Sequence, residues 1–199
     1  MAQNRILIVD FGGQYNQLIA RRVRECGVYS EVKSYESVTL DSIKAFDPKG
    51  IIFTGGPQSA YLEGAPSIDD GAFKLGIPIM GICYGAQLMA YKLGGKIATA
   101  PVSEYGRTDV VVTGKKGLLK GVDDETVCWM SHTDYISQVP EGFEITAHTE
   151  NCPVAAMEDR EKKFFAVQYH PEVNHTVQGS KMIRNFVIHI LSLIHISEP

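Results

Sequence analysis

The stretch from residue 77 to residue 93 constrains the fold of this chain more than any other. An apolar run without charges leads into a helix-like segment over residues 87–93, and Cys83 lies between them with Gly81 and Gly85 on either side. The apolar run is typical of a strand buried in a parallel sheet. A sharp strand-to-helix turn pushes out the residue at its corner, and small neighbours leave room for a ligand. The pattern therefore predicts a corner that presents Cys83.

A cysteine at such a corner suits nucleophilic chemistry. The free N–H groups and the positive dipole end of the following helix would face the sulfur and favour thiolate over thiol. A buried core cysteine is the alternative interpretation, because cysteine is among the residue types most often buried. The corner alone leaves these two interpretations evenly balanced.

A second motif, 87 residues after Cys83, shifts that balance. Residues 164–169 form another apolar, strand-like run, which is followed by His170 and, two residues on, by Glu172. A cysteine nucleophile needs a base within hydrogen-bonding reach, and that base needs a group that orients it. The chain contains all three groups, although their spacing does not show that they meet.

Three motifs in this order resemble those of the class I, or triad, glutamine amidotransferases: Thr54-Gly55-Gly56-Pro57, Gly81-Ile82-Cys83-Tyr84-Gly85-Ala86-Gln87 and His170-Pro171-Glu172. Within this family, residues 6–15 and 129–134 are similar to the N-terminal glutaminase domain of GMP synthases. The likeness runs from about residue 5 to residue 190. It implies hydrolysis of L-glutamine to glutamate and ammonia, with the ammonia passed to a synthetase.

The resemblance also implies roles for individual residues. Cys83 would form a γ-glutamyl thioester, His170 would act as acid and base, and Glu172 would orient the imidazole. The backbone N–H groups of Gly56 and Tyr84 would form the oxyanion hole, since glycine turns supply donors without side-chain clashes. A plain strand-ending turn is the alternative interpretation of the glycine motif.

Three further residues would bind the substrate. Gln87 lies one helical turn after Cys83 on the same face, and the resemblance makes it a contact of the glutamine head group. Ser131 and His132 end a predicted strand, and the resemblance implies backbone contacts from them to the substrate's amino and carboxylate groups. The alternatives are a helix-surface glutamine and an ordinary polar strand end.

Composition excludes several other classes of function. The chain has 199 residues, which suits one domain with a substantial core. Acidic residues outnumber basic ones by 23 to 19, so no nucleic-acid or membrane partner is expected. The chain has neither a secretory signal pattern nor an apolar run long enough to span a membrane.

Cysteine and histidine usage bears on location and metal binding. Four widely spaced cysteines, without a Cys-x-x-Cys pair, favour a reducing cytoplasm. No metal site is expected at His170, Glu172 and His175, because a His-x4-His spacing is common by chance and neither a cysteine pair nor a His-Glu-x-x-His helix accompanies it.

Strand-like and helix-like segments alternate along the chain. This predicts an α/β fold: a doubly wound, flavodoxin-like, mostly parallel sheet with helices on both faces and additional antiparallel strands in the C-terminal half. Ligands bind such sheets beyond the carboxyl ends of the strands, where Cys83 and both glycine turns fall. The expected strands are residues 5–10, 29–33, 50–54, 77–82, 96–100, 108–113, 126–131, 144–149, 154–158 and 163–169. The expected helices are residues 16–26, 41–46, 87–93 and 178–190, with a short helix capped by Ser67.

The likeness divides the chain unevenly. Residues 1–190 are expected to form one amidotransferase domain, and residues 191–199 an atypical tail that is either truncated, artefactual or the end of a free-standing subunit. The implied partner is an ATP pyrophosphatase domain or subunit that lies outside this chain and aminates XMP to GMP with ATP and Mg²⁺. This chain has no phosphate-loop motif, so no cofactor is expected within it.

Other functions fit parts of the pattern. An amidotransferase for anthranilate or carbamoyl phosphate synthesis would keep the triad, but the opening motif over residues 10–15 favours the GMP branch. A non-catalytic regulatory module of the same fold would not need Cys83, His170 and Glu172 intact. A cysteine peptidase fits less well, since Gln87 and Gly56 suit an amide-bearing amino acid.

Overall fold

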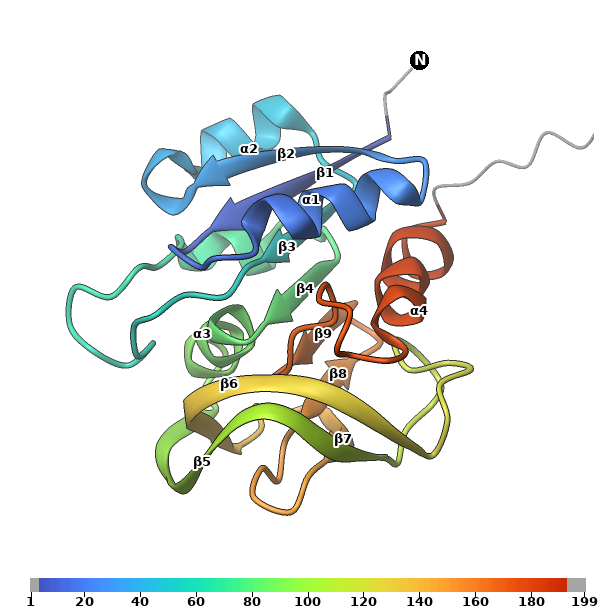
Figure 1. Cartoon of the computed structure of the whole chain (residues 1–199). Helices are drawn as coiled ribbons and strands as arrows, with labels where there is room; N and C mark the ends of the chain where they lie inside the picture. Colours follow the sequence, from blue (N-terminus) through green and yellow to red (C-terminus); the bar gives the residue numbers. More distant parts are fainter. Residues whose placement is uncertain (1–3, 193–199) are drawn as a thin grey trace, which may run out of the picture.

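The computed structural model describes residues 4–192, and within them nine strands form a single mixed sheet (Figure 1). The order across the sheet is β2-β1-β3-β4-β9-β8-β7-β5-β6. The strands are β1 (Arg5–Asp10), β2 (Tyr29–Ser34), β3 (Gly50–Phe53), β4 (Ile79–Ile82), β5 (Lys96–Val112), β6 (Glu125–Gln138), β7 (Glu144–His148), β8 (Ala156–Asp159) and β9 (Phe164–Val167). The helices are α1 (Asn16–Glu25), α2 (Leu40–Phe46), α3 (Tyr84–Lys92) and α4 (Gly179–Arg184), with short helical turns η1 (Tyr35–Ser37) and η2 (Asp70–Lys74) and a π-helical segment η3 (Asn185–Ile190).

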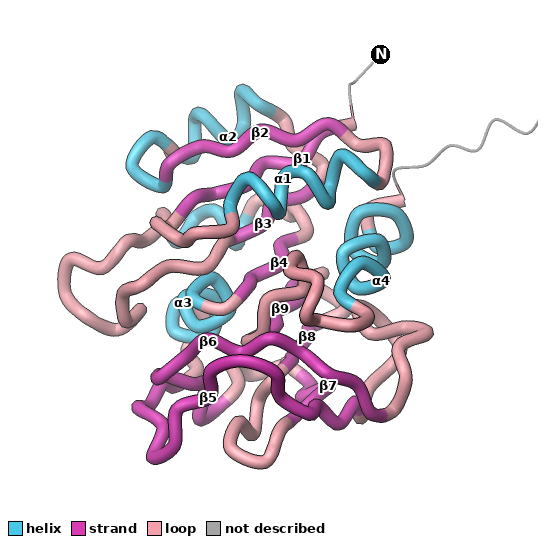
Figure 2. Tube along the Cα trace, in the orientation of Figure 1, coloured by secondary structure: helices cyan, strands magenta, loops and turns pink. Residues whose placement is uncertain are grey.

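The core of the sheet is parallel, and helices pack on both of its faces. Strands β2, β1, β3, β4 and β9 pair in parallel, in that order. Ile6 and Ile8 of β1 lie in the apolar cluster that includes α1 and α4. Leu7 and Val9, which point to the other face, lie in the cluster that includes α2 and α3. The helices lie on either side of the strands in Figure 2, and the prediction of a doubly wound α/β fold is confirmed.

The C-terminal half continues the sheet with antiparallel pairs, as expected. The prediction of two separate strands at residues 96–100 and 108–113 is wrong, because both belong to the long strand β5. The pairing of β5 with β6 shifts register between Thr99 and Glu104. Pro101 lies in this shift, and proline lacks the N–H that regular pairing requires. A bulge therefore accommodates what the sequence indicates as a break.

Several predicted element boundaries need correction. The cap of the short helix is Asp69, whose carboxylate accepts from Gly71 N–H at 2.8 Å, and not Ser67. Helix α3 begins at Tyr84, directly after Cys83, and not at Gln87. The final helix changes from α to π at Asn185, whose amide donates to the carbonyl of Leu118 at 2.7 Å.

The last described residues extend past the predicted domain end. The side chain of Leu191 lies over the start of β3, where a Cβ added to Gly50 would come within 2.6 Å of it. The remainder of the predicted tail, residues 193–199, lies outside the described residues. Among residues 4–192 no helix is both long and apolar enough to cross a membrane.

The two glycines beside Cys83 are needed for packing. A Cβ on Gly81 would lie 2.6 Å from the carbonyl oxygen of Gly85, and a Cβ on Gly85 would lie 2.5 Å from that of Phe53. Both glycines are buried. The expectation that they leave room for a ligand is therefore wrong: the space beside each is filled by the backbone of the corner itself and of β3.

We predict that Gly85→Ala destabilises the protein by about 1–3 kcal/mol, because the methyl group must displace backbone atoms of β3. Urea unfolding followed by circular dichroism measures the change. An unchanged unfolding midpoint would show that the corner has spare room, contrary to the packing described above.

Candidate active site

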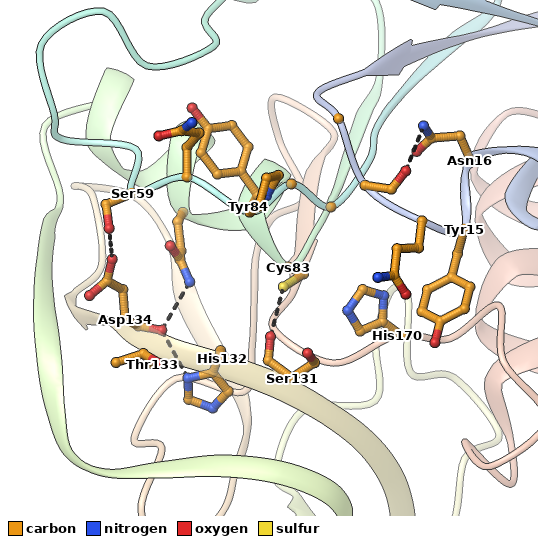
Figure 3. A pocket seen from close by; sticks show the side chains of 18 of the residues that line it. Tyr15, Asn16, Ser59, Cys83, Tyr84, Ser131, His132, Thr133, Asp134 and His170 are labelled. Atoms are coloured by element: carbon orange, nitrogen blue, oxygen red, sulfur yellow. Dashed lines mark hydrogen bonds between the residues drawn. The ribbon is translucent and has the colours of Figure 1, made fainter.

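A pocket of about 670 Å³ opens at the carboxyl ends of the parallel strands (Figure 3). Its lining comes from the turns after β1 and β3, from the Cys83 corner after β4, and from the segment after β9. Residues 131–134 of β6, called the β6 wall below, close another side. The pocket therefore combines segments from both halves of the sheet, where the sequence predicts a binding site.

Cys83 occupies a strained backbone conformation at the N-terminus of α3. Its φ of 53° and ψ of −108° place a non-glycine residue at positive φ, which is uncommon and costs conformational energy. The surroundings hold it there: its N–H donates to the Val167 carbonyl at 2.9 Å, and its carbonyl accepts from Ala86 and Gln87. The side chain is 5% exposed and lines the pocket.

His170 and Glu172 form a buried pair. Nδ1 of His170 lies 2.7 Å from Oε1 of Glu172, while Glu172 Oε2 is buried without a hydrogen-bond partner in the described part of the chain. The backbone of this segment is fixed at two points. Trp129 accepts from His170 N–H at 3.0 Å, and Arg22 Nε of α1 donates to the Glu172 carbonyl at 3.0 Å.

The structure brings the side chains of Cys83 and His170 close together beside Gly55. A Cβ built on Gly55 would lie 3.2 Å from His170 Cε1 and 3.7 Å from Cys83 Cβ. In Figure 3 the two side chains lie on neighbouring sides of the pocket. The sulfur also contacts the β6 wall, because Sγ donates to the Ser131 carbonyl at 3.6 Å.

The neighbours of His170 favour its charged form. Burial by itself lowers the pKa of His170, but hydrogen bonding to Cys83 and Glu172, together with their charges, outweighs it and raises that pKa from 6.5 to about 10. The arrangement therefore suits proton exchange between the two side chains.

The two backbone N–H groups predicted to form the oxyanion hole belong to pocket-lining residues. Gly56 and Tyr84 both line the pocket, and within residues 4–192 the N–H of neither is paired with a backbone acceptor. Gly56 has no room for a side chain, since its Cβ would lie 2.6 Å from the Phe11 carbonyl oxygen. Their service as an oxyanion hole stays a prediction.

Gln87 is not a helix-surface residue. It is 4% exposed, and its Nε2 donates to the Asp134 carbonyl at 2.9 Å and to Gln168 Oε1 at 3.1 Å. Its remaining polar atom is the acceptor Oε1, at a residue that lines the pocket.

Ser131 and His132 lie in the β6 wall, and both line the pocket. Ser131 is exposed, whereas the His132 ring is buried, and its Nδ1 lies 2.8 Å from the Asp134 carbonyl oxygen. The wall is joined to the loop after β3, because Ser59 Oγ donates to the Asp134 carboxylate. Thr99 of β5 donates to the same carboxylate at 3.1 Å.

Two residues of the pocket region were missed by the sequence reasoning. Gln168, which is 1% exposed, donates from Nε2 to Cys83 Sγ at 3.7 Å. Its position two residues before His170 was a usable signal, because alternate residues of an extended chain share a face. The Tyr15 ring packs edge-on against the His170 ring at 5.5 Å, and nothing in the sequence indicated that contact.

The described residues contain one group of potential metal ligands, and it is outside the predicted triad. The ligand atoms of Glu104, His132 and Cys152 lie within 4.8 Å of one another. Burial raises the pKa of Cys152 to about 12, which favours a thiol over the thiolate that binds metals. Thr149 Oγ1 donates to both Glu104 oxygens at 2.9 Å. The group therefore fits a hydrogen-bonded cluster better than a metal site.

Sequence comparison relates the chain to GMP synthases. The protein named GMP synthase [glutamine-hydrolyzing] from Clostridium botulinum (strain Alaska E43 / Type E3) is 60% identical over 190 residues, which are 96% of this chain and 37% of that protein. The protein of the same name from Caldicellulosiruptor saccharolyticus is 54% identical over 190 residues, again 96% of this chain and 37% of the relative. The chain thus spans little more than a third of the length of these curated relatives.

Solved structures and a family model agree with this. A protein from Thermoplasma acidophilum, described as one of the subunits of a GMP synthase, superposes with a TM-score of 0.79 at 31% identity, covering 96% of both chains. A glutamine amidotransferase from Thermotoga maritima shares the fold, with a TM-score of 0.77 at 16% identity, over 96% of this chain and 99% of the other. The model described as glutamine amidotransferase class-I matches residues 7–190. Together with the geometry of the pocket, these matches establish that the chain belongs to the class-I glutamine amidotransferase family.

Proposed function

We propose that this chain hydrolyses L-glutamine to glutamate and ammonia through a thioester on Cys83. The observation that carries the proposal is the strained corner at Cys83, set beside a histidine that is hydrogen-bonded to a buried carboxylate. Nucleophile, base and orienting group meet in one pocket, as acyl transfer by a cysteine requires. The family membership supports glutamine as the acyl donor.

The first half-reaction forms the thioester. The Cys83 sulfur attacks the side-chain amide carbon of glutamine, while its proton resides on His170. The tetrahedral intermediate then collapses, the C–N bond breaks, and His170 gives the proton to the departing nitrogen, which leaves as ammonia. Glu172 keeps the imidazole in the tautomer that presents Nε2 and stabilises its charged form.

The second half-reaction restores the enzyme. His170 accepts a proton from a water molecule, which attacks the thioester carbon, and the C–S bond breaks to release glutamate. In both half-reactions the carbonyl oxygen becomes negative, and the N–H groups of Gly56 and Tyr84 would stabilise it. Loss of one such donor typically costs about 100-fold or more in rate.

The rest of the pocket would bind the amino-acid end of the substrate. Gln87 offers Oε1, an acceptor that suits an ammonium group, because its Nε2 is already used by Asp134 and Gln168. The backbone of Ser131 and His132 would supply the further contacts. A glutamine head group is zwitterionic, so an acceptor and several backbone groups match its chemistry.

We further propose that the ammonia serves a synthetase that aminates XMP to GMP. The relatives that support this are named GMP synthases, and most of their length lies outside the match. The ATP pyrophosphatase domain or subunit would bind ATP and Mg²⁺, and the reaction would take place in the cytoplasm. No step within this chain requires either ligand.

We predict that 6-diazo-5-oxo-norleucine, a glutamine-like electrophile, labels Cys83. Binding of its amino-acid end should place the reactive carbon beside the sulfur, and excess glutamine should block the reaction. Mass spectrometry of the peptide that contains Cys83 reads the label, and Cys83→Ala is the control. A wild-type protein that stays unlabelled, or is labelled at the same rate with excess glutamine present, would refute the proposed function.

We predict that Glu172→Gln lowers the pKa of His170, because a hydrogen bond and a negative charge that raise it are altered together. A raised pKa stabilises the fold fully below pH 6.5, and this stabilisation is lost as the pH rises through about 10. In the variant the loss should begin at lower pH. NMR titration of the His170 Cε1–H group and urea unfolding against pH measure both effects. An unchanged titration of His170 in the variant would show that Glu172 does not stabilise the charged imidazole.

We predict that the XMP-aminating portion of a GMP synthase, added with XMP, ATP and Mg²⁺, increases glutamate release by this chain. Ammonia released without an acceptor is wasted, so the glutaminase is expected to be weakly active alone. A coupled glutamate assay measures the rate. Synthetases for anthranilate and carbamoyl phosphate are the matched comparisons, and stronger stimulation by either would assign the chain to that branch.

A further inference from the structure

We propose that Glu104 is a positioning residue, which holds the His132 ring and thereby fixes the Asp134 carbonyl and Gln87 for substrate binding. This proposal deepens the proposed function and rests on it for the identity of the substrate. Glu104 belongs to β5, outside every motif that carried the family resemblance.

Glu104 carries a carboxylate whose burial depends on its hydrogen-bond partners. It is 7% exposed and pairs directly opposite His132, immediately after the register shift in β5. Oε1 lies 3.3 Å from His132 Nε2, and both oxygens accept from Thr149. A buried acid needs such partners, because an unpaired one is costly.

The His132 ring transmits this anchor to the pocket. A backbone carbonyl only accepts, so Nδ1, which lies 2.8 Å from the Asp134 carbonyl oxygen, must carry a hydrogen. The same oxygen accepts from Gln87 Nε2 at 2.9 Å. Glu104, His132, the Asp134 carbonyl and Gln87 thus form one hydrogen-bonded chain that ends at a pocket-lining residue.

The chain of contacts continues to the nucleophile. Gln87 Nε2 also donates to Gln168 Oε1, and Gln168 Nε2 donates to Cys83 Sγ. Each amide has its orientation fixed by its neighbour, so a displaced Asp134 carbonyl would first disturb Gln87. We therefore expect loss of Glu104 to impair binding of the substrate's head group more than the intrinsic reactivity of the sulfur.

We expect the positioning role of Glu104 to depend on the length of its side chain and on its hydrogen bonds, and not on its charge. A glutamine at position 104 could keep Oε1 where it contacts both His132 Nε2 and Thr149 Oγ1, and would lose only the second bond from Thr149. An aspartate would keep the charge, but its carboxylate would be withdrawn by one methylene from the His132 ring. Glu104→Gln and Glu104→Asp therefore separate length from charge.

The first test uses NMR and needs no substrate. The side-chain amide resonances of Gln87 report its bond to the Asp134 carbonyl. They should move in Glu104→Asp and stay near their wild-type positions in Glu104→Gln. The matched control is Glu158→Asp, which shortens another buried acidic side chain. Glu158 accepts a hydrogen bond from the N–H of Leu118, which lies on the opposite face of the sheet from α3, the helix of Gln87. Unmoved Gln87 resonances in Glu104→Asp would overturn the proposal.

The second test compares two reagents at Cys83 by mass spectrometry. Glu104→Asp should slow labelling by 6-diazo-5-oxo-norleucine about tenfold, the loss expected for one broken hydrogen bond to a charged group. Iodoacetamide, which has no amino-acid end, should react at the wild-type rate, and Glu104→Gln should match wild type with both reagents. The positioning role would be overturned if Glu104→Asp slowed labelling of Cys83 by both reagents equally. It would also be overturned if Glu104→Asp and Glu104→Gln slowed labelling by 6-diazo-5-oxo-norleucine to the same extent.

The two tests keep the proposals separable. A wild-type protein inert to 6-diazo-5-oxo-norleucine would refute the glutaminase assignment, while the Gln87 resonances would still decide whether Glu104 positions that residue. If Zn²⁺ added to Glu104→Asp moved the Gln87 resonances back toward their wild-type positions, the Glu104 cluster would instead be a metal site. That result would also overturn the hydrogen-bonding role.

Discussion

The candidate site depends on the parallel pairing of β4 with β9. This pairing sets Gly81 opposite Ala166 and Ile82 opposite Val167, although the two strands are separated by more than 80 residues in sequence. The residues that follow each strand must then emerge side by side. Cys83 leaves one strand and Gln168 the other, with His170 two residues further along. No local motif could create this meeting, and a slip of one residue would turn His170 away from the pocket.

The same pairing also divides the sheet into two functions. Up to β9 the strands are parallel, and their carboxyl ends supply turns, the proposed nucleophile and the N-terminus of α3. Beyond β9 the antiparallel strands supply a surface, the β6 wall, that lines the same pocket as those turns. The half with the proposed catalytic residues and the half with the proposed binding residues are thus joined in one sheet, and the hydrogen bond of Ser59 to Asp134 connects them a second time.

Much of this arrangement could be predicted from the sequence, but for different reasons in the two halves. The corner at Cys83 and the motif at His170 are local patterns, and family resemblance related them to each other. Glu104 could not be found this way, because its contact with His132 depends on a bulge that periodicity does not reveal. The glycines beside Cys83 were recognised as necessary, yet the reason is the backbone of β3, which only coordinates can show.

The oxygen of Glu172 that has no hydrogen-bond partner among the described residues has a consequence for the order of events. The carboxylate is 1% exposed, so its negative charge is balanced chiefly by the imidazolium of His170. If His170 gives its proton to the leaving nitrogen, as we propose, the buried charge is left without compensation, which raises the free energy of that state. The uptake of a proton from water relieves this imbalance. The buried carboxylate of Glu172 would thus raise the free energy of the proposed thioester, whichever proton donor restores the charge on His170.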